Sequence, residues 1–125
     1  ACTTLQDLAE VSRRLMLQEQ LPESASFNLG PNDLVMLRRA MRAERARGNE
    51  VVDVFASEFN DERVRFYSKP GFAGDWFSDN IYIFDPRVSQ AWIVSMAGNP
   101  GRRSLDSAAS AIAKIIASGE LRAVK

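Results

Sequence analysis

The sequence predicts an α+β domain in which a four-stranded, mostly antiparallel sheet is covered by two N-terminal helices and one C-terminal helix. Three observations support this fold class. Apolar residues recur at helical spacing near both ends of the chain, short apolar runs fill the middle, and the connections between those runs are too short for parallel crossovers. We therefore expect a single domain over residues 1–125, in the order helix, helix, four strands, helix, with the helices on one face of the sheet.

The first helix is expected to begin after Thr4. This residue can cap the helix, and Asp7 stands three positions on, where an acidic residue completes a weak form of the capping box. The apolar residues that follow share one side of a 3.6-residue wheel. The helix should end near Gln20, because Pro22 disfavours helical geometry at the residue before it.

A second helix is expected from Pro31 to Arg47, with Gly48 as its left-handed C-terminal residue. Arg38, Arg42 and Arg45 share one side of this helix and form its basic face. Three interpretations stay open. The arginines are solvated or pair with the acidic residues between positions 50 and 62, they contact a protein, or they bind nucleic-acid phosphates.

Four strands are expected in the middle of the chain: Val51–Phe59, Arg63–Ser68, Ile81–Phe84 and Ala91–Met96. The first two alternate between apolar and polar residues and should form a hairpin around Asn60 and Asp61. The last two are almost wholly apolar, which indicates central strands. A C-terminal helix should follow from Ser104 to Gly119 and cover the sheet.

Two surfaces are candidates for binding. The segment Lys69–Asn80 is expected to be a loop that contains three aromatic residues, Phe72, Trp76 and Phe77, and the acidic residues Asp75 and Asp79. Of these, Trp76, Phe77 and the two acidic residues are the expected contacts. Large aromatic side chains in a loop either fold back as a lid over the core or serve as anchors for a partner. The second candidate is the outer face of the first hairpin, where Arg63, Arg65 and Tyr67 would lie in a row.

The composition argues against several classes of activity. The chain has no histidine, which excludes His-based catalytic triads and His-ligated zinc within one chain. Its single cysteine, Cys2, rules out an intrachain disulfide. The 16 basic and 16 acidic residues balance, so no overall charge attracts nucleic acid or an anionic membrane. No Gly-rich phosphate-binding motif occurs, and no carboxylates have the spacing of a metal-binding or catalytic pair.

These observations lead to the expectation of a non-enzymatic protein-binding module without cofactor or metal. An inhibitor, an immunity protein or a phage or plasmid accessory factor, which acts by occluding a partner protein, would fit this description. The alternative is a nucleic-acid-binding protein that uses the Arg-rich second helix. No apolar run reaches the length of a membrane span, and a cytoplasmic location is expected.

Overall fold

The computed structural model describes residues 3–43 and 51–121. Within this part of the chain, four α-helices and three β-strands follow one another in the order α1, α2, α3, β1, β2, β3, α4. Their bounds are α1 Leu5–Met16, α2 Pro31–Met41, α3 Val51–Phe59, β1 Arg65–Ala73, β2 Trp76–Asp85, β3 Gln90–Gly98 and α4 Asp106–Ala117. Short 3₁₀ helices occupy Gln18–Gln20, Glu23–Ala25 and Arg102–Leu105.

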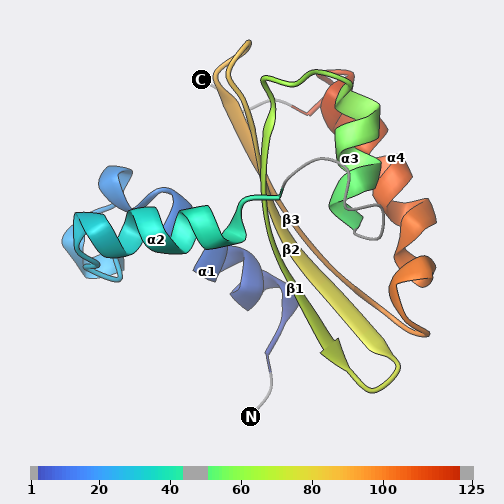
Figure 1. Cartoon of the computed structure of the whole chain (residues 1–125), viewed down its shortest axis with the longest axis horizontal. Coiled ribbons are helices and arrows are strands. Elements are labelled where there is room, and N and C mark those ends of the chain that lie inside the picture. The colour runs from blue at the N-terminus through green and yellow to red at the C-terminus, as the bar shows by residue number, and fades with distance from the viewer. Residues whose placement is uncertain (1–2, 44–50, 122–125) are drawn as a thin grey trace.

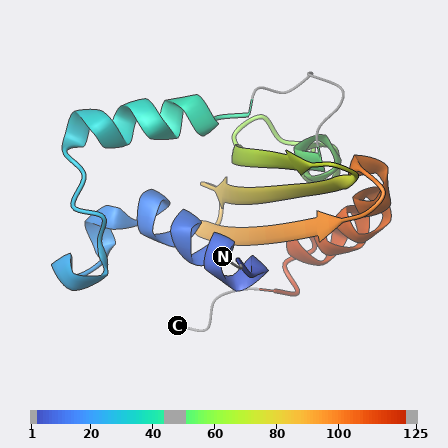
Figure 2. The same cartoon turned by 90° about the horizontal axis from the view of Figure 1, so that it is seen from below.

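The three strands form an antiparallel sheet in the order β1-β2-β3. Figure 1 shows helices on both faces of this sheet, with α1 and α2 on one side and α3 and α4 on the other. The view from below in Figure 2 shows the same layers, with the sheet between the two pairs of helices. The expectation that the helices lie on one face is therefore wrong.

The expected four-stranded sheet is also wrong, because Val51–Phe59 is helix α3. Three of its buried residues, Val51, Phe55 and Phe59, are spaced four apart and form one helical stripe. Three valines and two phenylalanines favour a strand locally, but such propensities depend on the surroundings. Here packing against α4 and the sheet decides the conformation, since a helix of nine residues is not stable alone.

The segment Lys69–Asn80 is not a loop, because Lys69–Ala73 continues β1 and Trp76–Asn80 begins β2. The two strands pair from Arg65 opposite Phe84 to Ala73 opposite Trp76, so the chain reverses within two residues. Gly74 has a φ of 59°, which suits the first central position of a tight hairpin turn. The hairpin therefore joins β1 to β2, and the one expected around Asn60 and Asp61 does not form.

Several local predictions for the helices are confirmed. Thr4 and Asp7 form a complete capping box at the start of α1, and Pro31 opens α2. The α-helical part of α1 ends at Met16, before a 3₁₀ turn that reaches Gln20. Helix α2 ends at Met41, so it is shorter than expected, and the expected end at Arg47 and Gly48 lies outside the described residues.

The C-terminal helix forms as expected, but it begins two residues after the expected start at Ser104. Ser104 lies in a 3₁₀ turn, where its hydroxyl donates to the carbonyl oxygen of Gly101, and α4 begins at Asp106. The main hydrophobic core lies between this helix, α3 and the sheet. Phe55, Ile81 and Ala109 are fully buried there, one from each layer. The opposite face of the sheet is less apolar, and it forms the floor of the cleft described below.

Candidate functional site

The tip of the β1–β2 hairpin exposes two large aromatic side chains. Phe72 is 79% exposed and Trp76 is 56% exposed, whereas Phe77 is 3% exposed and belongs to the core. Phe72 lies opposite Phe77 in the strand register, and their rings make an edge contact with centroids 4.9 Å apart. Trp76 lies opposite Ala73, so the two exposed rings stand on opposite faces of the hairpin.

A shallow hollow of about 220 Å³ lies beside these rings. Its lining residues come from both strands of the hairpin and from the end of β3: Gly71, Phe72, Ala73, Trp76, Phe77, Ser78 and Ala97. The volume of this hollow would accommodate one amino-acid side chain, but it is below the range of about 300–1,000 Å³ that is usual for small-molecule sites. The hairpin tip, meaning Phe72 to Trp76, is therefore an exposed aromatic edge with an adjoining apolar depression.

The two acidic residues expected near the aromatic rings are separated by the fold. Asp75 is exposed in the hairpin turn, and its carbonyl oxygen accepts a hydrogen bond from the amide of Gly101. Asp79 is fully buried on the sheet face that packs against α3 and α4, where it accepts a 2.7 Å hydrogen bond from the hydroxyl of Ser68. Asp79 therefore contributes to the interior, and Asp75 alone of the two faces solvent.

Arg63, Arg65 and Tyr67 do not form one stripe on a strand. Arg63 precedes β1 and holds Asp61 in a two-point ion pair, which places the pKa of the Asp61 carboxyl well below its usual range. Arg65 is exposed at the start of β1. Tyr67 is half-buried against Tyr82 on the sheet face that carries α1 and α2, with ring centroids 6.0 Å apart.

The expected basic face of the second helix is also divided. Arg38 points to α1, where its guanidinium contacts Glu19 and the carbonyl oxygens of Leu15 and Met16. Arg42 is exposed just after the end of α2, and Arg45 lies outside the described residues. Of the three arginines proposed to bind phosphates, Arg38 thus uses its guanidinium in contacts within the protein.

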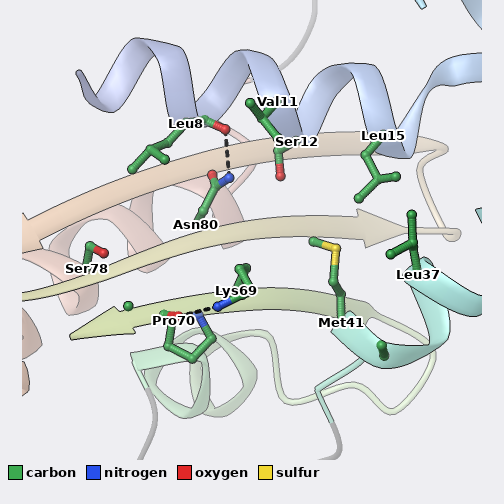
Figure 3. Close-up of a pocket in the computed structure, with 12 residues that line it drawn as sticks. Leu8, Val11, Ser12, Leu15, Leu37, Met41, Lys69, Pro70, Ser78 and Asn80 are labelled. Atoms are coloured by element: carbon green, nitrogen blue, oxygen red, sulfur yellow. Dashed lines mark hydrogen bonds between the residues drawn. The ribbon is translucent and has the colours of Figure 1, made fainter. Parts of the chain in front are cut away.

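A larger cavity, which the sequence reasoning missed, lies between α1, α2 and the sheet. This interhelical cleft has a volume of about 620 Å³. Apolar side chains of the two helices form its walls, and residues of β1 and β2 form its floor (Figure 3). The walls are Leu8, Val11, Leu15, Leu37, Ala40 and Met41, and the remaining lining residues are Ser12, Lys69, Pro70, Gly71, Ser78 and Asn80.

Gly71 helps to keep the floor of the interhelical cleft open. A Cβ atom built on this residue would lie 2.8 Å from the Ser78 hydroxyl oxygen, which is closer than such atoms normally approach. Pro70, beside it, has no amide hydrogen, as suits an edge strand such as β1. Pro70 and Gly71 therefore make part of the floor small and rigid on the edge strand β1.

Three polar groups of the interhelical cleft have different hydrogen-bond states. The Asn80 carboxamide donates to the carbonyl oxygen of Leu8 at 2.7 Å and accepts from the Ser95 hydroxyl at 2.7 Å. The Lys69 ammonium donates to the Pro70 carbonyl oxygen at 2.9 Å. Ser12 is 1% exposed, and its hydroxyl has no hydrogen-bond partner among the described residues. Figure 3 shows this hydroxyl directed from α1 toward the sheet.

Sequence reasoning placed the apolar residues of the first helix on one side of it but could not show what that side faces, and that is why it missed the cleft. The signal that was available is Ser12, a polar residue among the apolar positions of α1. Whether Ser12 packs against a neighbouring element or lines a cavity depends on the distance between the two helices and the sheet. That distance is a property of the tertiary structure.

The described part of the chain has neither a metal-binding cluster nor a membrane-spanning helix. It contains no group of three or more acidic, cysteine or histidine side chains that could hold a metal ion. None of its helices has the length and apolarity that crossing a bilayer requires.

No protein-family model and no curated protein matches the sequence.

Proposed function

We propose that this protein is a non-enzymatic protein-binding module that contacts its partner through the hairpin tip and occludes a surface of that partner, as inhibitors and immunity proteins do. The observation that carries the proposal is the exposure of Phe72 and Trp76, at 79% and 56%. Exposed aromatic rings of this size lose the benefit of burial in the free protein, and they recover it when a partner covers them.

The position of the two rings also supports a protein contact. They stand on the two faces of an antiparallel hairpin, which the strand pairing and the Asp75–Gly101 backbone hydrogen bond hold in place. A rigid edge of this kind loses little conformational entropy on binding, and aromatic residues are enriched among those that dominate interface energies. The adjoining hollow of about 220 Å³ would accept one apolar side chain of the partner.

The proposal is tested by replacing each ring while the partner is captured from cells of the native host. We expect Trp76→Ala and Phe72→Ala each to weaken the complex at least about tenfold, which corresponds to the loss of an interface anchor. Val88→Ala is the matched control, because Val88 is also an exposed apolar residue but lies in the turn between β2 and β3. Circular dichroism would show that all three variants keep the fold.

Capture of the same partner with equal affinity by the two tip variants and the control would refute the assignment of the hairpin tip. A partner that is DNA or RNA and is released by moderate salt would instead favour the alternative function. In that case Arg42→Ala, rather than either tip variant, should reduce binding.

A further inference from the structure

We propose that the interhelical cleft is a binding site for an uncharged, mainly aliphatic small molecule that carries one hydrogen-bonding oxygen atom. Gly71 and Ser78 line both this cleft and the hollow beside the hairpin tip, but the walls of the cleft come from α1 and α2, and the proposal does not rest on the proposed protein contact. A cavity of about 620 Å³ lies within the range of about 300–1,000 Å³ that is usual for small-molecule sites. Its apolar walls and the buried hydroxyl of Ser12, which has no hydrogen-bond partner among the described residues, identify the chemistry of the ligand.

The walls favour an aliphatic ligand without a charge. Leu8 and Leu15 of α1 face Leu37 and Met41 of α2 across the cleft (Figure 3). A charged group placed between these four side chains would lose its hydration, and none of the four could act as its partner. Among the described lining residues the one charged group is the Lys69 ammonium, which is bound to the Pro70 carbonyl oxygen.

The hydroxyl of Ser12 supplies the polar contact. It is buried, it points toward the sheet, and it makes no hydrogen bond to a described residue. A buried polar group without a partner is unfavourable, so most buried hydroxyls in proteins are bonded. A ligand carbonyl or hydroxyl oxygen that accepts a hydrogen bond from the Ser12 Oγ would remove this cost.

Asn80 limits where the ligand oxygen can bind. Both ends of its carboxamide are engaged, one with the Leu8 carbonyl oxygen of α1 and the other with the Ser95 hydroxyl of β3. These bonds hold α1 against the sheet, so they keep the cleft in shape and do not need a ligand. Ser12 is therefore the residue that distinguishes an oxygen-bearing ligand from a hydrocarbon.

The experiment uses the methionine methyl groups of the full chain as reporters in ¹³C NMR. Met41 lines the cleft, whereas Met36 is 61% exposed and is not among the lining residues, so it serves as an internal control. We expect 1-octanol and 2-octanone to shift the Met41 methyl signal in a saturable manner and to leave the Met36 signal in place. Octanoate, which has the same chain length but a charge, should bind more weakly.

Two variants separate binding in the cleft from adsorption to the surface. Ser12→Ala should weaken 1-octanol binding by about 2–10-fold, the net value of one hydrogen bond, and should leave toluene binding unchanged. Ala40→Leu narrows the cleft and should reduce the binding of all the probes. Ala111→Leu is its control, because Ala111 is exposed on α4, on the other side of the sheet.

Three results would overturn the proposal. The first is a Met41 signal that does not respond to any uncharged probe. The second is binding that Ala40→Leu leaves intact. The third is a Met41 shift that follows protein concentration instead of probe concentration, together with a dimer in analytical ultracentrifugation. In that last case a second copy of the chain occupies the cleft.

Discussion

The guanidinium of Arg38 holds both carboxylate oxygens of Glu19 at 2.7 Å. The same group donates to the carbonyl oxygens of Leu15 and Met16 at the end of α1. The last carbonyls of a helix have no partner within the helix, so a side chain of α2 here completes the hydrogen bonding of α1. Arg38 thus fixes the two walls of the interhelical cleft relative to each other.

Removing the donors of Arg38 should destabilise the protein. We expect Arg38→Met, which keeps an apolar side chain of similar length, to lower the free energy of unfolding by about 1–2 kcal/mol, because hydrogen bonds from a charged donor to the α1 carbonyls are lost. Arg39→Met is the control, since Arg39 is exposed on the next position of the same helix. Urea denaturation measures both variants, and an equal loss in the two would contradict this role.

The same contact predicts a dependence of stability on pH. Arg38 lowers the pKa of Glu19 from 4.5 to about 2. A carboxyl whose pKa is lower in the folded state stabilises the protein above its unfolded pKa, and this contribution is lost as the pH falls from 4.5 through 2. Because the Glu19 side chain is 60% exposed, the contribution should not exceed about 1 kcal/mol.

The measurement compares the wild type with Glu19→Gln in denaturant at pH 6 and pH 2.5. The difference in stability between the two proteins should be larger at pH 6 than at pH 2.5. A difference that is constant over this range would show that the ionised carboxylate of Glu19 is not what Arg38 requires.

A pair of substitutions in α3 distinguishes its helix from the strand that the sequence predicted. In a strand, Phe55 and Ser57 would share one face, whereas in the helix Phe55 is fully buried and Ser57 is exposed. We expect Phe55→Ala to cost about 3–5 kcal/mol of stability because it leaves a cavity in the core. Ser57→Ala should change the stability by no more than about 0.5 kcal/mol. Similar costs for the two variants would contradict the helix.

Loss of the capping box of α1 should lower the stability by less than the loss of the Phe55 ring. The amide of Asp7 donates to the Thr4 hydroxyl at 3.1 Å, and the Asp7 carboxylate accepts from the Thr4 amide at 2.9 Å. Thr4→Ala should lower the free energy of unfolding by about 1 kcal/mol, the usual value of such a cap. Thr3→Ala, one residue before the cap, provides the comparison in the same denaturation assay.

The candidate sites could be predicted from the sequence only in part. Trp76 is exposed in the segment where unusual aromatic content predicted either a lid over the core or a binding surface. Phe72, the more exposed ring, belongs to the same aromatic segment but was not among the expected contacts, because the difference in exposure between Phe72 and Phe77 depends on the tertiary packing of the hairpin. The interhelical cleft could not be predicted, since its two walls come from helices that the sequence describes separately.

Features that rest on neighbouring residues follow from the sequence alone. Thr4 with Asp7 starts α1, and Pro31 starts α2, because a cap or a first-turn proline acts within three or four residues of the chain. Other features depend on contacts between distant parts of the chain. The segment Val51–Phe59 has the composition of a strand but folds as a helix against α4, because burial of its apolar stripe outweighs a local preference. Arg38 likewise belongs to a basic helix by sequence, and Glu19 and the end of α1, more than fifteen residues away, give it a structural role.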